Sequence, residues 1–204
     1  KCPQFEKFLD ESFEGDKELI DLLRAAFKWS LLPKDRKKAY EIELFFDLFG
    51  RRGSGKGTLL EVLMAVVGGE DSCGTIRSNT FDKPTSLYSL VGKKIAIDPD
   101  SSGHIKNVGI FNSIVSNEPV EVKKLFLNES SERIGVVVWR AYNDNPSASG
   151  GGVEGIGRRI VTFEFKRVSS NPDPTLKTKL LEEVAGIFQW CWSMSKEEAI
   201  ETLT

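Results

Sequence analysis

The sequence predicts an α/β fold with a largely parallel central sheet, together with helical segments at the N-terminal and C-terminal ends. Apolar stretches typical of strands alternate with helical patterns over residues 39–168, and Gly, Pro and Asn separate them. A glycine-rich turn joins the first of these strands to an apolar helix. The chain has 204 residues, which is enough to bury the core of one domain with appendages.

The chain divides into three zones. Residues 1–38 are charged and carry apolar side chains at helical spacing until Pro33 breaks the pattern, which predicts a small helical collar segment. The core follows over residues 39–168. A turn-rich break then opens a C-terminal helical tail over residues 169–204, in which residues 176–192 predict one amphipathic helix.

A glycine-rich loop with the sequence GRRGSGKGT lies between an expected strand over residues 42–49 and an apolar helix over residues 59–67. Glycines allow positive φ angles, so successive backbone N–H groups can converge on phosphate oxygens. Lys56 is expected to reach the β- and γ-phosphates of ATP, and the positive end of the helix adds to the attraction. The expected ATP-binding residues are Gly50, Gly53, Ser54, Gly55, Lys56, Gly57 and Thr58.

Gly57 departs from the usual pattern, in which a Ser or Thr directly after the lysine binds Mg²⁺ through its hydroxyl. Two interpretations stay open. Either Thr58 takes this role in a shifted register, or the metal depends more on an acidic residue elsewhere. A glycine-rich turn without a ligand is the alternative to both, and the combination of strand, lysine and helix argues against it.

Residues 91–100 predict a short strand that ends in two acidic residues, Asp98 and Asp100. In phosphate-loop ATPases, one acid at such a strand end holds Mg²⁺ and a second orients or activates water. We therefore expect Asp98 to bind the metal together with Thr58, and Asp100 to act on the water. The alternative is an ordinary turn, because Asp and Pro are common turn formers.

The composition narrows the classes of function. A net charge of −2 and a pI of about 5.7 argue against a broadly basic surface, so a nucleic-acid contact is expected only as a local patch. Three scattered cysteines and one histidine predict free thiols and no zinc site. Neither a membrane span nor a signal peptide is expected. Because the first residue is not Met, we expect the chain to be a piece of a larger protein.

Several stretches follow the loop in a fixed order: a lead into the acidic strand, a helix and basic strand, a strand ending in Asn143, an arginine pair before a strand, and a closing helix. They occupy residues 81 and 87–94, 111–124, 136–146, 157–165 and 180–190. In this order they resemble the superfamily 3 helicases, the AAA+ motors attached to primases of phages, plasmids and large DNA viruses. The resemblance is closest to the poxvirus and phage primase–helicase branch and covers nearly the whole chain.

The resemblance implies an AAA+-type P-loop ATPase core over residues 39–168 that uses ATP and Mg²⁺ at subunit interfaces to translocate on single-stranded DNA. Asn143 would hydrogen-bond the γ-phosphate or the attacking water. Arg159 would act as an arginine finger on the neighbouring subunit, with Arg158 as the alternative. Lys123 and Lys124 would line a DNA channel.

The resemblance also implies a homo-oligomer, expected as a hexameric ring, and a primase or primase-polymerase domain in the same full-length chain. No membrane contact is expected, and the expected location is the cytoplasm, that of the host cell for a phage, plasmid or virus. Another function stays open: a P-loop ATPase that serves as an assembly or loading switch without unwinding. A motor needs the trans arginine and the two lysines, whereas a switch does not need the lysines. A small-molecule kinase ranks last, since no lid or acceptor site is recognisable.

Overall fold

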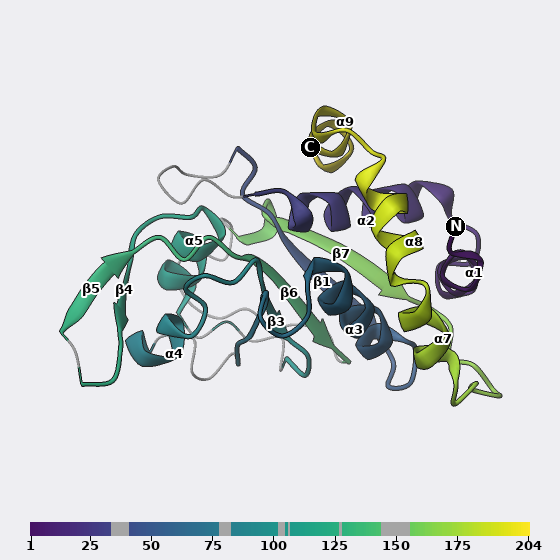
Figure 1. Ribbon diagram of the computed structural model, residues 1–204, viewed down its shortest axis with the longest axis horizontal. Coiled ribbons are helices and arrows are strands. Elements are labelled where there is room, and N and C mark those ends of the chain that lie inside the picture. The colour runs from purple at the N-terminus through teal and green to yellow at the C-terminus, as the bar shows by residue number, and fades with distance from the viewer. Residues whose placement is uncertain (34–40, 78–82, 102–104, 106, 127, 144–155) are drawn as a thin grey trace.

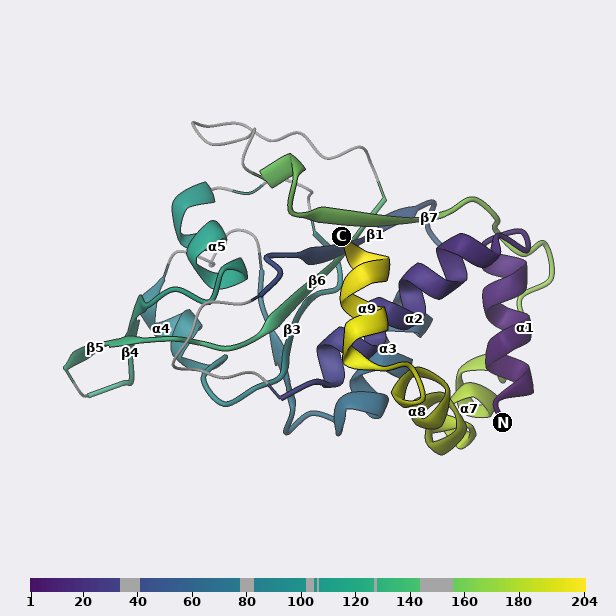
Figure 2. The same cartoon turned by 90° about the horizontal axis from the view of Figure 1, so that it is seen from above.

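A computed structural model of the chain describes residues 1–33, 41–77, 83–101, 105, 107–126, 128–143 and 156–204. The described residues form three layers, with a central sheet between two layers of helices (Figures 1 and 2). None of the described helices is long and apolar enough to span a bilayer.

The central sheet has five strands, and every pair of neighbours is parallel. In spatial order they are β2 (Cys73–Thr75), β3 (Ile95–Asp98), β6 (Val137–Tyr142), β1 (Phe45–Gly50) and β7 (Ile160–Phe165). This confirms the predicted α/β fold with its parallel sheet. Because all strands run the same way, their carboxyl ends meet at one edge. The acidic strand β3 is separated from the loop strand β1 by β6.

One face of the sheet is covered by helices from both ends of the chain and by the helix that follows the glycine-rich loop (Figure 2). These helices are α1 (Pro3–Ser12), α2 (Lys17–Leu31), α3 (Lys56–Val67), α7 (Leu176–Glu182), α8 (Val184–Trp192) and α9 (Lys196–Leu203). Trp139 of β6 anchors this layer: its ring meets Phe27 edge-on, and its indole N–H donates to Ser30 Oγ at 3.0 Å. All three predicted zones therefore contribute to one hydrophobic core.

The opposite face is covered by α4 (Pro84–Tyr88) and α5 (Val108–Val115), and Phe111 packs edge-on against Phe45 of β1. An antiparallel hairpin of β4 (Val120–Lys123) and β5 (Glu129–Glu132) extends from this side, away from the central sheet (Figure 1). The predicted sequence of helix, turn and strand over residues 111–124 is present. This side of the sheet therefore holds the second hydrophobic core cluster.

The single helix predicted over residues 176–192 is wrong, because Glu183 separates α7 from α8. The Glu183 carboxylate instead accepts hydrogen bonds from the backbone N–H groups of Gln4 and Phe5, at 3.1 and 3.0 Å. Such contacts satisfy donors that the first turn of α1 leaves without intrahelical partners. Gly186 lets the two ends of the chain meet, since a Cβ there would overlap the carbonyl of Lys1.

Candidate nucleotide-binding site

The glycine-rich loop joins β1 to α3 at the carboxyl edge of the sheet, as predicted. Gly50, Gly53 and Gly55 have φ angles of 153°, 80° and 104°, a region that side chains disfavour. A Cβ on Gly50 would lie 2.5 Å from the carbonyl oxygen of Phe165, and one on Gly55 would lie 2.9 Å from the ring of Phe8. The loop thus needs glycine for its backbone angles and for its close packing.

Helix α3 begins at Lys56, and its N-cap is Gly55, which has no side chain to accept from the first-turn N–H groups. These N–H groups and the positive end of the helix dipole are therefore available to an anion at the loop. At its other end the helix stops at Gly68, which has a left-handed conformation, in agreement with the prediction.

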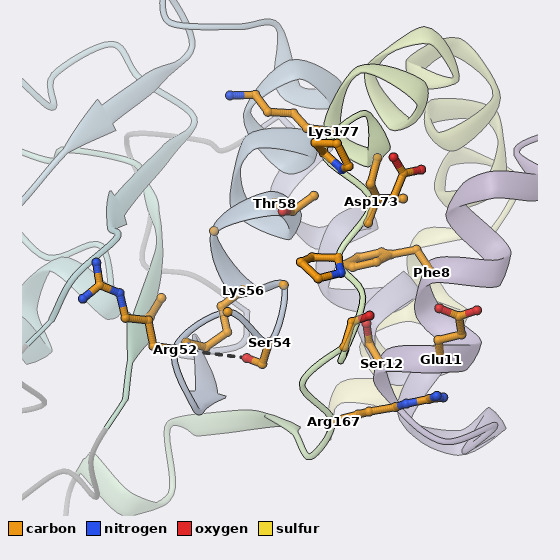
Figure 3. A pocket seen from close by; sticks show the side chains of 18 of the residues that line it. Phe8, Glu11, Ser12, Arg52, Ser54, Lys56, Thr58, Arg167, Asp173 and Lys177 are labelled. Carbon is orange, nitrogen blue, oxygen red and sulfur yellow. Dashed lines mark hydrogen bonds between the residues drawn. The ribbon is translucent and has the colours of Figure 1, made fainter.

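Lys56 lies at the centre of the loop and is 7% exposed. Its Nζ donates to the carbonyls of Gly50 and Arg51 at 2.6 and 3.0 Å, and to Asn143 Oδ1 at 3.0 Å. Ser54 Oγ lies 3.4 Å from the same nitrogen (Figure 3). Burial lowers the pKa of Lys56. The structure thus brings together two predicted site residues that are 87 positions apart in the sequence.

A cleft of about 1010 Å³ opens beside the loop. The loop lysine, Thr58 of α3, and Asp100 and Asn143 from the carboxyl edge of the sheet all line it. Its other wall comes from α1 and from the segment after β7, with Phe8, Glu11, Ser12, Arg167, Asp173 and Lys177 (Figure 3). Sequence analysis missed this wall, because no local motif marks it and only the packing of the two chain ends brings it to the loop.

The two predicted acidic residues have different environments. Asp100 is exposed and lines the cleft, as does Pro99. Asp98 is 3% exposed and does not line the cleft. It shares a face of β3 with Ala96, whose neighbours belong to the core cluster beneath α5, and it lies in register with Arg140. Asp100 is therefore the acid of this pair that faces the cleft.

Gly57 is exposed, and a Cβ built on it would meet nothing within 4 Å. Thr58 is half-buried and lines the cleft. Successive helical residues are rotated by about 100°, so Thr58 points in a different direction from a side chain at position 57. Thr58 and Asp100 both line the cleft, so both interpretations of the metal site stay open. The described residues contain no cluster of three or more His, Cys, Asp or Glu suited to a metal ion.

The arginine pair lies at the opposite edge of the sheet, at the start of β7. The carbonyl of Arg159 accepts from the N–H of Phe45, the first residue of β1. At about 3.3 Å per residue along β1, this edge is about 17 Å from the loop of the same chain. A finger role toward this chain's own cleft is therefore excluded by distance.

The guanidinium of Arg159 is engaged within the chain. Its Nε and Nη2 donate to Glu43 Oε2 at 2.9 and 2.5 Å, and its side chain is 12% exposed. Burial of Glu43 favours its protonated form, but hydrogen bonds from Arg159 and Ser116 and the charges of both arginines outweigh this and lower the pKa of Glu43. Arg158 is exposed. Of the two arginines, Arg158 is the one presented to solvent.

The predicted basic strand is part of the hairpin and carries a mixed charge. Lys123 forms an ion pair with Glu129 across the hairpin at 3.2 Å, and Lys124 lies with its Nζ 5.9 Å from the ring centre of Tyr88. Over residues 120–132 the sequence has Glu at positions 121, 129 and 132 against these two lysines. Phe126, missed by sequence analysis, is fully exposed at the tip with a φ of 66°.

Two residues singled out by pattern, Phe81 and Pro146, lie outside the described residues. Apart from Asp98, which is buried in the sheet, the remaining predicted positions fall into three groups in space. The loop, Asn143 and Asp100 meet at the cleft, the arginine pair lies at the other edge of the sheet, and the lysines lie on the hairpin.

The fold and this site define an α/β protein with a glycine-rich loop and a buried lysine at the carboxyl edge of a parallel sheet. The chain belongs to the family DUF5906, described as a family of unknown function, whose model matches residues 48–159. The matched segment runs from within β1 to the arginine pair.

The fold is also that of the NrS-1 C-terminal region. The A form of that region in its apo state matches with a TM-score of 0.73 at 15% identity, over 99% of this chain and 51% of that one. Another apo structure of the region has a TM-score of 0.75 at 14% identity, over 98% and 47%. The chain thus spans about half the length of these solved chains. A match to the JCV helicase, with a TM-score of 0.47 and 17% identity over 98% and 60%, is too weak to define a fold.

Proposed function

We propose that this protein binds ATP in the cleft and hydrolyses it as the motor domain of a superfamily 3 AAA+ helicase acting on single-stranded DNA. The observation that carries the proposal is the contact of Lys56 with Asn143 across the mouth of the glycine-rich loop. Phosphate oxygens would replace the loop carbonyls that now accept from Lys56, and the N-terminal N–H groups of α3 would add further donors. Asn143 would then lie beside the γ-phosphate.

The cleft suits Mg²⁺ bound with ATP. This ion keeps several waters and is usually held by one or two carboxylates together with substrate phosphates, so a cage of protein ligands is not needed. In our proposal Asp100 holds it, because this carboxylate lines the cleft. Thr58 lines the same cleft and would contact a phosphate. When bound, the ion would neutralise charge on the phosphate oxygens during transfer.

Hydrolysis is proposed to require a second subunit, within a ring expected to be hexameric. Because β1 separates the two edges of the sheet, an arginine about 17 Å from its own loop can act only on a neighbour's cleft. Arg158 is the proposed finger, since it is exposed, whereas Arg159 is bound to Glu43. A primase in the full-length chain and a cytoplasmic location stay predictions.

Single-stranded DNA is proposed to contact the hairpin near its tip. Lys124 would neutralise a phosphate and Phe126 would stack on a base, because exposed aromatic rings are sequence-tolerant platforms for single strands. Lys123 would contribute less, since Glu129 already neutralises it.

The test is ATP hydrolysis measured with and without single-stranded DNA, followed by mixing of inactive variants. Lys56→Ala removes the phosphate contact, and Arg158→Ala removes the proposed finger while leaving its own cleft intact. Mixed assemblies should recover hydrolysis where an intact cleft meets an intact arginine. If recovery occurs with Arg159→Ala in place of Arg158→Ala, the finger role moves to Arg159. If mass analysis shows mixed rings without recovery, the shared site is refuted.

The second candidate is an ATP-dependent assembly or loading switch that does not unwind DNA. It is favoured by the charges of the hairpin, which has three glutamates and two lysines over residues 120–132. One of these lysines, Lys123, is already neutralised by Glu129. The salt dependence of single-stranded DNA binding separates the two functions. Lys124→Ala should reduce the log–log slope by roughly 0.7 for a motor, since one phosphate contact is lost. An unchanged slope with normal ATP hydrolysis supports the switch.

A further inference from the structure

Three charged side chains lie buried beneath the floor of the cleft, on three adjacent strands. Asp47 of β1 is 0% exposed, Arg140 of β6 is 2% exposed and Asp98 of β3 is 3% exposed. Arg140 lies in register with Asp47 on one side and with Asp98 on the other. Residues in register in a parallel sheet project from the same face, so the three side chains form one row across the sheet. We name this row the charge layer.

Specific contacts hold Arg140 and Asp47 of the charge layer together. Arg140 donates to both carboxylate oxygens of Asp47, from Nε at 2.8 Å and from Nη2 at 2.6 Å. Its guanidinium carbon lies 5.0 Å from the ring centre of Phe45 and 5.6 Å from that of Phe111. The Tyr142 hydroxyl also hydrogen-bonds Asp47. The Arg140 side chain is thereby fixed by bidentate geometry and by aromatic packing.

Arg140 Nη1 is buried and has no hydrogen-bond partner among the described residues. A buried ion pair has a desolvation cost that well-packed apolar side chains of similar volume do not have, and a buried donor without a partner adds to it. A row of apolar side chains at this place would thus stabilise the fold as well or better. The charge layer therefore calls for an explanation other than stability, and its position relative to the cleft supplies one.

Each member of the charge layer precedes, by two or three positions along the chain, a residue of the glycine-rich loop or of the cleft. Asp47 is followed by Gly50, the first residue of the loop, and Arg140 by Asn143, which accepts from Lys56. Asp98 is followed by Asp100, which lines the cleft. The ends of β1 and β6 are thus joined, just below the cleft, by the contacts of Arg140 with Asp47, and the end of β3 lies beside them with Asp98 in register with Arg140.

We propose that the charge layer sets the relative positions of these three strand ends, and that Arg140 is a positioning residue for ATP turnover. Bidentate contacts fix the position of one strand along its neighbour, and they do so more strictly than apolar packing does. The statement about turnover rests on the proposed function, whereas the statement about strand ends does not. Catalytic groups must be held within about 0.5 Å of their productive geometry, so a shift at this depth reaches the site directly.

The experiment compares the apolar double variant Asp47→Leu/Arg140→Met with Val138→Ala. The double variant replaces the Asp47–Arg140 pair by apolar side chains of similar volume, so neither member of the pair is left without the other, and Asp98 is kept. Val138 is the matched control, because it is buried in β6 on the same face, two residues before Arg140, and carries no charge. Hydrogen exchange of the backbone amides is measured at residues 50–55, 100–101 and 142–143, together with ATP turnover and affinity.

In the double variant, exchange should accelerate at all three segments by at least tenfold relative to the control, at matched global stability. Turnover should fall by about 10²-fold, as expected for a misplacement of about 1 Å, with ATP affinity changed by less than about threefold. Exchange equal to that of the control overturns the proposal. Accelerated exchange with normal turnover keeps the strand-end role and refutes the role in catalysis. Accelerated exchange in a protein whose parent neither binds nor hydrolyses ATP refutes the proposed function only.

Should the double variant not fold, Asp47→Asn replaces it. This change keeps the shape and one of the two acceptor positions for Arg140, while it removes the charge and the other acceptor. The same three segments should then exchange faster than in Val138→Ala. Exchange in Asp47→Asn equal to that in Val138→Ala at these segments would equally overturn the proposal.

Discussion

Lys56→Ala is expected to abolish most ATP binding while leaving the fold intact. In the proposed complex the ammonium contacts a β- and a γ-phosphate oxygen, and hydrogen bonds to charged groups contribute about 1.5–3 kcal/mol each, so the gross loss is about 3–6 kcal/mol. ATP must first displace the contacts that Lys56 makes with the Gly50 and Arg51 carbonyls, which offsets part of this gain. A net loss of about 3 kcal/mol of binding free energy raises the dissociation constant for ATP by about 100-fold.

Titration calorimetry with ATP and Mg²⁺ measures this change, and thermal unfolding checks the fold. Lys93→Ala is the matched control, because its Nζ also donates to two backbone carbonyls, those of Glu70 and Asp71, but does not line the cleft. The control should bind ATP as the parent does. An affinity of folded Lys56→Ala within about threefold of the parent would show that the lysine does not anchor phosphate, since less than 1 kcal/mol would then be lost.

Three further changes test separate parts of the structure. Gly57→Ser should be tolerated, since a Cβ there meets nothing within 4 Å. The new hydroxyl, directly after the lysine, should lower the Mg²⁺ concentration needed for ATP hydrolysis. An unchanged Mg²⁺ requirement would refute a metal position next to Gly57. Because the pKa of Glu43 lies below its ordinary value of 4.5, its ion pair stabilises the fold above pH 4.5, and this stabilisation is lost as the pH falls through the pKa of the folded state. Glu43→Gln should therefore flatten the fall of the melting temperature at acid pH, and an identical fall in the variant and the parent would contradict this. Gly186→Ala should destabilise by about 1–3 kcal/mol in chemical denaturation, because its methyl group overlaps the Lys1 carbonyl, and unchanged unfolding would show that the chain ends do not pack closely.

Local patterns determined the elements that depend on near neighbours in the chain. The glycine-rich loop was predictable because the positive φ angles and close approaches at Gly50 and Gly55 demand glycine, and a helix begins directly behind it. The strand ending at Asp98 and the helix ending at Gly68 were predictable for the same reason: apolar runs and stop signals act over a few residues. In contrast, strand β1 begins three residues later than the expected start at position 42.

Tertiary structure decided which side chains meet. The sequence places Asp98 and Asp100 alike at a strand end, but Asp98 is the last residue of β3 and is buried in the sheet, whereas Asp100 lies two residues beyond the strand and lines the cleft. The second wall of the cleft, including Phe8, could not be predicted, because it depends on Glu183 and Gly186 joining the two ends of the chain. The partners of Arg140 depend in the same way on strand order and register, which come from long-range pairing that no local pattern records.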